Sequence, residues 1–305
     1  MAVHSIKILV ILTLEKLRIL LPDTMYLKLQ FRLRMGYYPD FNNPKTFSEK
    51  LQWLKLHNQN PFYTKLVDKY DVKYYVAKKI GSQYIIETIG VWNDVESIQW
   101  DILPNSFVLK TTHGGGSSGV IVCPNKFLFN RERAKISLKK SLKQDIYKTF
   151  CEWPYKNVRK RIIAERFMKQ VDGSPLIDYK FFCFNGIPKF LYVRRSTFGN
   201  KPSLVNFIYP DWTAAPFWRD GDVPSSTLPE KPQRFDKMLN IASKLSEDLV
   251  FARIDLYEIN GDIYFSEITF FPASGLLPFN SIEWDRKLGD MLSLPQPFSS
   301  YKYDR

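Results

Sequence analysis

The sequence FARIDLYEINGDIYFSEIT, residues 251–269, predicts a β-hairpin around its central Asn-Gly dipeptide. Successive side chains of a strand point to opposite faces, so Arg253 and Asp255 share one face of the first strand. On the second strand Glu267 and Thr269 share a face in the same way. Neighbouring carboxylates provide the oxygen ligands that Mg²⁺ prefers. The hairpin is therefore a candidate metal site, although an exposed polar face with an arginine–acid pair would also explain the pattern.

The register of this hairpin decides whether its acids can act together. A two-residue turn with no other irregularity would pair Asp255 with Ser266 and turn Glu267 to the opposite face. Two carboxylates cannot share one metal ion from opposite faces of a sheet. We therefore expect one extra residue, either in a three-residue loop or in a β-bulge. Asp255 would then pair with Glu267, and Arg253 with Thr269.

A glycine-rich turn follows an earlier predicted strand, 107–110, which ends in Lys110. After His113, the turn reads Gly114-Gly115-Gly116-Ser117-Ser118-Gly119 and leads into another strand. Adjacent glycines let backbone N–H groups approach a phosphate, and a lysine adds positive charge. The turn is not a Walker loop, because it lacks the terminal Gly-Lys-Ser/Thr and no helix follows. A flexible hairpin, with a loop histidine that contacts no phosphate, remains an equally good interpretation.

Helical patterns fill the first part of the chain, and strands dominate the rest. Within residues 1–40 we expect a basic, amphipathic helix that ends near Met35-Gly36, and we expect another helix over residues 61–80. Thr46 with Glu49 has the form of a capping box that opens a further helix. Apolar strands are expected at 161–168, 176–184 and 188–194, and a helix at 235–245. Glu165 lies in the first of these strands, while Asp178 and Lys180 share one face of the second. The pattern predicts an α+β fold.

Composition narrows the class of protein. The chain has 305 residues, 45% of them hydrophobic, which is enough for one or two domains with a buried core. Cys123, Cys151 and Cys183 are too far apart for metal-ligand spacing, and we interpret them as buried thiols of a reducing compartment. A net charge of +13 favours an anionic partner. No common nucleic-acid-reading motif is present, so we expect no nucleic-acid partner.

The N-terminal segment is apolar and basic. The apolar run at residues 6–14 is interrupted by charges soon afterwards, is too short to span a bilayer, and lacks a signal-peptide cleavage pattern. Two interpretations stay open. The segment is either an amphipathic helix packed on the protein, or a helix that lies on an anionic membrane with help from Lys28, Arg32 and Arg34.

The order of these elements, from about residue 68 to residue 278, resembles the ATP-grasp superfamily, which includes the D-alanine–D-alanine ligases. Two groups of segments resemble its TupA-like branch more specifically. The first is Asn43-Pro44-Lys45-Thr46-Phe47 with Glu49-Lys50-Leu51, and the second is Arg253-Ile254-Asp255-Leu256-Tyr257 with Glu267-Ile268-Thr269-Phe270. This branch is associated with teichuronopeptide, capsule and related surface-polysaccharide assembly. The resemblance implies a nucleotide held between two mainly antiparallel sheet-plus-helix subdomains, with a helical N-terminal extension.

The resemblance also implies roles for individual residues. It places ATP against Lys69, Lys110, His113 and the glycine turn, adenine at Glu165, Phe167 and Met168, and the ribose at Asp178. It gives Arg253 and Lys180 catalytic positions and makes Asp255, Glu267 and Thr269 the Mg²⁺ ligands. The superfamily commonly has asparagine where Thr269 stands, which puts the number of metal ions in question. Arg194, Arg195 and Ser274 are candidates to face the substrate.

The resemblance implies an ATP-dependent ligase that activates a carboxylate as an acyl phosphate and joins it to an amine. A uronic acid of a surface polysaccharide, coupled to an amino acid, is the implied reaction. The expected units are 1–60, 61–168 and 169–305, namely a helical extension, a small subdomain and a large subdomain. We expect a cytoplasmic protein, with a peripheral position on the inner face of the plasma membrane, or contact with the polysaccharide-assembly machinery, as an open alternative. The competing hypotheses are a glycosyltransferase of the same pathway and a nucleotide-binding scaffold.

Overall fold

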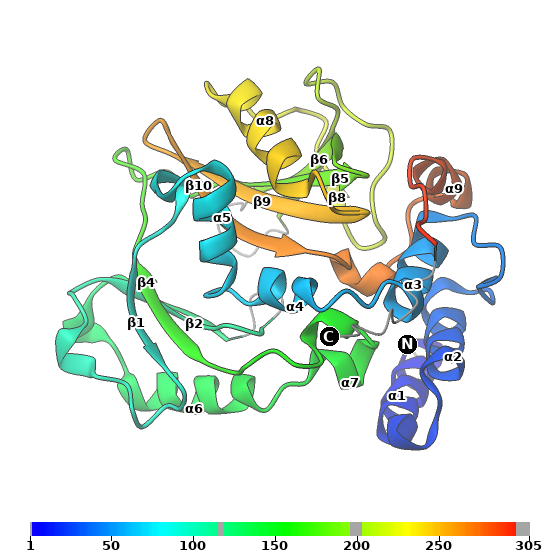
Figure 1. Cartoon of the computed structure of the whole chain (residues 1–305), viewed down its shortest axis with the longest axis horizontal. Coiled ribbons are helices and arrows are strands. Elements are labelled where there is room, and N and C mark those ends of the chain that lie inside the picture. The colour runs from blue at the N-terminus through cyan, green and yellow to red at the C-terminus, as the bar shows by residue number, and fades with distance from the viewer. Residues whose placement is uncertain (1, 115–118, 196–202, 297–305) are drawn as a thin grey trace, which may run out of the picture.

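The computed structural model describes residues 2–114, 119–195 and 203–296, whose strands form two sheets (Figure 1). The smaller sheet has the order β1-β4-β2-β3 and the larger has the order β10-β9-β5-β6-β7-β8. Helices cover both sheets, so the α+β prediction is confirmed. The strands are β1 Thr88–Trp92, β2 Phe107–Thr111, β3 Val120–Cys123, β4 Ile162–Arg166, β5 Asp178–Phe184, β6 Ile187–Arg195, β7 Leu204–Ile208, β8 Val223–Pro224, β9 Phe251–Ile259 and β10 Asp262–Thr269.

Within the described ranges the α-helices are α1 Ala2–Lys16, α2 Asp23–Met35, α3 Phe47–His57, α4 Phe62–Val67, α5 Val72–Ile80, α6 Arg131–Leu142, α7 Ile146–Phe150, α8 Phe235–Ser246 and α9 Ile282–Asp290. Helix α8 lies on the outer face of the large sheet and α6 on that of the small sheet, α4 and α5 lie between the sheets, and α9 packs against α3 (Figure 1). The predicted capping box is confirmed, because the Thr46 side chain accepts from the Glu49 amide and the Glu49 carboxylate accepts from the Thr46 amide.

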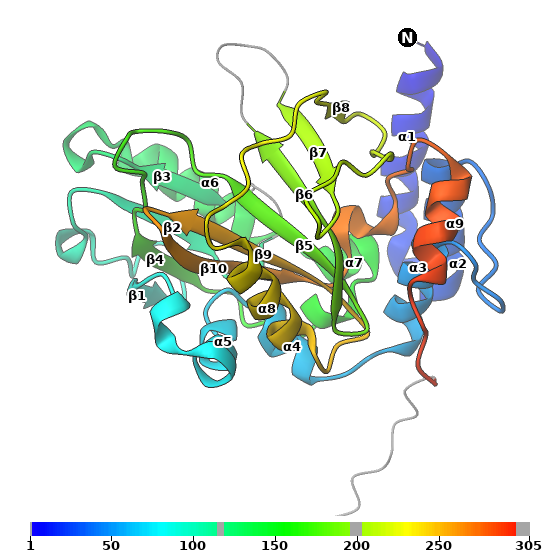
Figure 2. The same ribbon diagram turned by 90° about the horizontal axis from the view of Figure 1, so that it is seen from above.

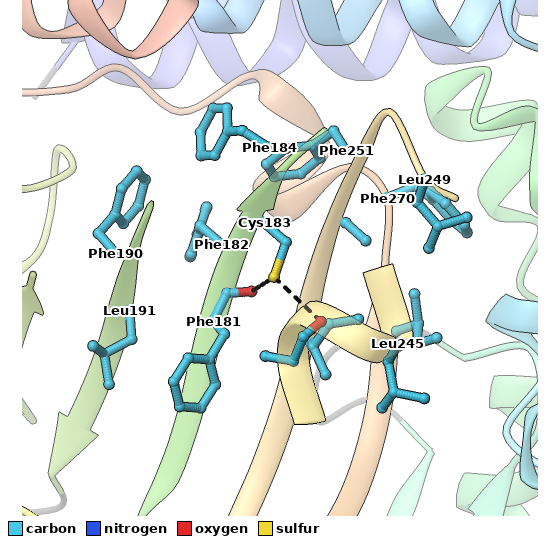
Figure 3. Packing of buried hydrophobic residues seen from close by; sticks show 14 of the residues in the cluster. Phe181, Phe182, Cys183, Phe184, Phe190, Leu191, Leu245, Leu249, Phe251 and Phe270 are labelled. Carbon is cyan, nitrogen blue, oxygen red and sulfur yellow. Dashed lines mark hydrogen bonds between the residues drawn. The ribbon is translucent and has the colours of Figure 1, made fainter. Parts of the chain in front are cut away.

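The two sheets have separate hydrophobic cores. Phe107, Leu109 and Ile162 are buried in the small sheet, where α6 packs against β2. The core of the large sheet is rich in phenylalanine and is covered on one face by α8 (Figure 1). Within that core, Cys183 on β5 lies 3.7 Å from the Phe181 carbonyl oxygen and 3.8 Å from that of Ala242 (Figure 3). Cys183, like the other two cysteines, is a buried free thiol, as expected.

The single helix predicted over residues 61–80 is wrong, because the chain forms α4 and α5 with a turn between them. The carboxylate of Asp68 accepts hydrogen bonds from the amides of Tyr70 and Asp71, which replaces helical bonding at this point. The guanidinium of Arg161 lies 3.0 Å from Asp68 and 2.8 Å from Asp71. Arg161, which directly precedes β4 of the small sheet, therefore holds the turn between α4 and α5. Lys69 lies within this turn.

The N-terminal segment also differs from expectation. The predicted end near Met35-Gly36 is confirmed, because α2 ends at Met35. The segment is not one helix, however, since a 3₁₀ turn at Leu17–Leu20 and then Leu21 and Pro22 separate α1 from α2, and α1 projects beyond the body of the molecule (Figure 2). Helix α1 is not amphipathic, because apolar side chains are exposed on several of its sides. Within the described residues, no helix is both long and apolar enough to cross a membrane.

Residues assigned to the N-terminal extension reach the main core. Phe47 and Leu51 of α3 are buried with the large sheet, as are Val67 and Val76 near the start of the expected small subdomain. Gly289 of α9 permits the close approach of α3, since a Cβ there would lie 2.1 Å from the Lys45 carbonyl oxygen. The boundaries 1–60, 61–168 and 169–305 remain a proposal, although helices α3, α4 and α5 share their core with the large sheet.

Candidate active site

The observed hairpin places its acids on one face. Asn260 and Gly261 form a two-residue turn with positive φ angles of 52° and 81°. The strands pair regularly until a register shift at Ser266, after which Glu267 lies opposite Asp255. The extra residue is therefore a bulge, one of the two predicted forms, and the three-residue loop is wrong. The twist of the strands favours the short turn, so the irregularity moves into the strand.

Cations of the large sheet hold both acids. Arg253 donates to the two carboxylate oxygens of Asp255 at 2.7 and 2.6 Å, and to Glu267 at 2.9 Å. The Thr269 hydroxyl donates to Glu267 at 3.3 Å, and Lys69 lies 3.2 Å from the same carboxylate. Burial alone would raise the pKa of Glu267, but Lys69, Arg253 and nearby Lys180 lower it to about 2. Glu267 is thus a fixed negative charge at neutral pH.

The neighbouring strand β5 adds a second acid and a lysine. Lys180 lies opposite Asp255 and donates to it at 2.8 Å, and it also pairs with Asp178. Burial and the nearby charge of Asp255 raise the pKa of Asp178 to about 6, in spite of Lys180. The pKa of Lys180 is raised, because the two acids outweigh its burial. The structure therefore joins Asp178, Lys180, Asp255 and Arg253 in one ionic network.

A second network lies on the small sheet. Glu165 on β4 is buried, with Lys110 of β2 and Lys73 of α5 each 2.6 Å from its carboxylate. These two lysines lower the pKa of Glu165 although burial opposes the change. Lys73 was missed in the sequence analysis, and its only signal was the four-residue spacing from Lys69. Phe167 and Met168 follow β4 in irregular structure, and their contact with adenine stays a prediction.

Lys69 connects the two networks. Its amide donates to the Thr112 carbonyl at 2.9 Å, and its ammonium donates to the Gly114 carbonyl while it pairs with Glu267. The pKa of Lys110 is raised, because Glu165 chiefly, and also Tyr257 and Glu267, outweigh its burial. Lys110 of the small sheet and Glu267 of the large sheet are thus close enough for the charge of one to affect the pKa of the other, and Lys69 lies beside Glu267 at the start of the glycine turn.

The glycine turn itself is only partly described. His113 is buried, and burial lowers its pKa, so it is neutral at physiological pH. Gly114 is buried beside it. Gly115, Gly116, Ser117 and Ser118 lie outside the described residues. Their contact with phosphate remains a prediction.

The three candidate substrate residues do not lie together. Arg194 pairs with Asp178 across β5 and β6 and shares its face, whereas Arg195 lies on the opposite face, where it donates to Ser225 at 2.8 Å. Ser274 is buried after β10 with a positive φ of 57°, and its hydroxyl accepts from Lys55 at 2.8 Å. Arg194 is therefore the candidate that the structure brings to the face of the ionic networks.

The residues present fit a divalent cation bound together with phosphates. No group of three or more His, Cys, Asp or Glu side chains able to hold a metal occurs in the part of the chain that the structure describes. Asp255 and Glu267 face each other across the hairpin with the Thr269 hydroxyl beside them. Mg²⁺ is usually bound by one or two carboxylates while phosphates and waters complete its octahedron. These two carboxylates and one hydroxyl therefore suit Mg²⁺, although the ion and Arg253 would both have to contact Asp255 and Glu267.

Solved structures similar to the chain include a D-alanine–D-alanine ligase from Bacillus anthracis, with 16% identity, 67% of this chain and 57% of the other covered, and a TM-score of 0.38. D-alanyl-alanine synthetase A from Vibrio cholerae has 13% identity, 74% and 62% coverage, and a TM-score of 0.42. The ADP complex of an N5-carboxyaminoimidazole ribonucleotide synthetase has 16% identity, 80% and 56% coverage, and a TM-score of 0.40.

The chain spans 56–62% of these three solved proteins. No curated protein matches the chain. The family assignment rests instead on a match that runs from residue 49 to residue 293 and so includes every ionic network described above. The chain belongs to the TupA-like ATP-grasp family.

Proposed function

We propose that the protein is an ATP-dependent carboxylate–amine ligase that works through an acyl phosphate. The observation that supports this most is the convergence of Lys110 and Lys69 with the Asp255–Glu267 pair from the other sheet. Cations on one side and carboxylates on the other provide what a nucleotide triphosphate with Mg²⁺ requires. Solved ligases of similar fold have been crystallised with ATP or ADP.

The roles of the chain's own residues follow from their charges. Lys69 and Lys110 would bind phosphate oxygens, and Arg253 would stabilise the charge that spreads over the transferring phosphoryl group. Bound Mg²⁺ would hold the phosphate oxygens and neutralise their charge. Asp178 would accept from the ribose hydroxyls, and the glycine turn would exclude water from the reactive acyl phosphate. An amine then displaces phosphate from the acyl carbon, and an amide forms.

We further propose a uronic acid of a bacterial surface polysaccharide as the carboxylate and an amino acid as the amine. The TupA-like family match and the net charge of +13 support this substrate class. We propose a cytoplasmic location at the inner membrane face. The exposed apolar side chains of α1, with the exposed Lys7 and Lys16 of the same helix, support that place.

Release of ADP from MgATP tests the proposal. Sugar acids and amino acids are supplied singly and in pairs, and turnover is expected only with a pair whose product has the summed mass less one water. With the acid alone, hydroxylamine should trap the acyl phosphate as a hydroxamate. Consumption of a nucleotide sugar without ATP would identify a glycosyltransferase, and ATP binding without turnover for any pair would identify a scaffold.

A further inference from the structure

Arg219 is a buried cation on the side of the large sheet that carries the ionic networks. It lies in the segment between β7 and β8, and 8% of its surface is exposed. Its guanidinium carbon lies 5.3 Å from the centre of the Phe182 ring, 5.9 Å from that of Phe207 and 5.5 Å from that of Phe279. These aromatic faces give it weak compensation for lost water.

No protein carboxylate neutralises this guanidinium. Among residues 2–114, 119–195 and 203–296, no carboxylate lies within 4.0 Å of the guanidinium nitrogens. The Asp222 carboxylate accepts from the Arg219 backbone amide at 3.2 Å, and it and Asp285 act on the guanidinium charge only from further away. Burial chiefly, and then the charge of Arg253, lower the pKa of Arg219 to about 10, so it remains protonated. The partly buried cations Arg253 and Lys180, by contrast, both pair with Asp255. A buried cation without a partner is unfavourable and therefore marks a place for an anion.

The sheet register shows where this anion would lie. Phe182 is opposite Arg253 on β9, and Phe207 is opposite Tyr192, which itself pairs with Lys180. The sheet order β10-β9-β5-β6-β7 then puts Arg219 on the β7 side of Arg253. Glu267 and Lys69 lie on the β10 side. An anion at Arg219 is thus adjacent to the phosphoryl-transfer residues but separate from the proposed metal acids.

We propose that Arg219 binds a carboxylate of the substrate, an inference that rests on the ligase function proposed above. A planar guanidinium pairs with a carboxylate through two parallel hydrogen bonds, and the three phenylalanine rings keep water from this pair. The lysines beside the glycine turn already serve the phosphates of ATP. A carboxylate held at Arg219 lies on the opposite side of Arg253, the position from which it can approach the terminal phosphate.

The test measures carboxylate binding to the full chain saturated with MgADP. Acetate and glucuronate are titrated at constant ionic strength. Chloride is the comparison for an anion without a carboxylate, glucose is the neutral comparison, and inorganic phosphate is a competing oxyanion. The wild-type protein should bind both carboxylates. Arg219→Met, which keeps the length and apolar contacts, should lose at least about 10-fold in affinity. Arg234→Met, at an exposed arginine paired with Asp262, is the matched control and should bind as the wild type does.

Further measurements separate a binding role from a structural one. Because the buried charge lacks a partner, Arg219→Met should melt at the same temperature as the wild type or higher, and a marked fall would overturn the proposal. Arg219→Lys keeps a charge but not the planar fork, so wild-type affinity in this variant would also overturn it. The proposal would also be overturned if the wild type bound neither acetate nor glucuronate. It would likewise be overturned if phosphate bound at Arg219 more tightly than either carboxylate. Every variant should bind MgADP with wild-type affinity. If the wild-type protein itself does not bind MgADP, that result contradicts the proposed nucleotide site and not the role of Arg219.

Discussion

Individual charges at the site depend on their neighbours as much as on their own chemistry. Glu267 and Asp178 are both partly buried carboxylates, yet the pKa of the first falls to about 2 and that of the second rises to about 6. Three cations outweigh burial at Glu267, whereas Asp178 has the charge of Asp255 beside it. Substitutions at the site therefore remove a partner from a network and not only a single contact.

Lys110→Ala should weaken MgATP binding. The change removes a charge-assisted contact worth about 1.5–3 kcal/mol, or about 10- to 100-fold in affinity. Lys73 remains to neutralise Glu165, so the fold should persist. Calorimetric titration of MgATP measures the effect, and Lys139→Ala, at an exposed lysine paired with Glu96, is the control. Equal affinities of Lys110→Ala and the wild type would contradict the nucleotide role of Lys110.

Glu267→Gln should abolish Mg²⁺-dependent ADP release while the protein stays folded. A neutral amide is a poorer ligand for a hard cation, and the charge that holds Lys69 and Arg253 is lost with it. Turnover is measured across a range of Mg²⁺ concentrations, and circular dichroism checks the fold. Glu247→Gln, at an exposed acid on the outer surface, should retain activity. Wild-type ADP release by Glu267→Gln would place the metal elsewhere.

Helices α3 and α9 meet through a buried acid. Asp285, in the first turn of α9, accepts at 3.0 Å from the Ser48 amide at the start of α3. Its other carboxylate oxygen has no hydrogen-bond partner in the described protein. Burial raises the pKa of Asp285 to about 6 from its ordinary value of 3.8, so the junction is formed most favourably by the protonated acid.

Asp285→Asn should therefore change the pH dependence of stability. As pH rises from 3.8 to about 6, the unfolded chain releases this proton before the folded chain does, so the folded state loses stability. Asparagine keeps the acceptor without the charge. The variant should be more stable than the wild type by about 1–3 kcal/mol at about pH 8, with little difference at about pH 4. Denaturant unfolding at both pH values measures this. If Asp285→Asn destabilised the protein equally at both pH values, Asp285 would act only as a hydrogen-bond acceptor and its charge would not matter.

Helix α1 should determine location and not catalysis. Ile8, Leu9 and Leu12 are exposed, whereas Leu14 is buried against α2. Replacement of the three exposed residues by serine should abolish binding to vesicles that contain anionic lipid and leave ADP release unchanged. Sedimentation with vesicles is the measurement. A double serine substitution at Phe127 and Leu128, exposed near the small sheet, should bind as the wild type does. Undiminished vesicle binding by the triple variant would exclude α1 as the contact.

Helix α3, which lies within the expected N-terminal extension, shares its hydrophobic core with the large sheet. The Phe47 ring lies 5.3 Å from that of Phe184 and 5.0 Å from that of Phe251. Phe47→Ala should therefore lower the free energy of unfolding by about 3–5 kcal/mol. Phe127→Ala, at a residue 92% exposed, should change it by about 0.5 kcal/mol or less. Similar small effects from both substitutions in chemical denaturation would show that residues 1–60 form a separable extension.

Local patterns in the sequence were sufficient for many elements of this fold. Side-chain alternation predicted the hairpin strands, and the capping box predicted the start of α3, because both depend on neighbours within a few residues. The requirement that Asp255 and Glu267 share a face predicted an extra residue. The strands and the cap are set by backbone geometry that short segments already possess, whereas the extra residue followed from the chemistry expected of the two acids.

Only the tertiary structure decided the remaining features. It placed the extra residue at Ser266 and not in the turn, and it separated α4 from α5 through the contact of Asp68 with distant Arg161. It also enclosed Arg219 between rings from three separate segments of the chain. These features depend on contacts between residues far apart in the sequence, whose geometry no local pattern encodes. The sequence by itself determined the strands, their faces and the acids they carry, whereas packing determined which charges meet and left the Arg219 guanidinium without a carboxylate partner among the described residues.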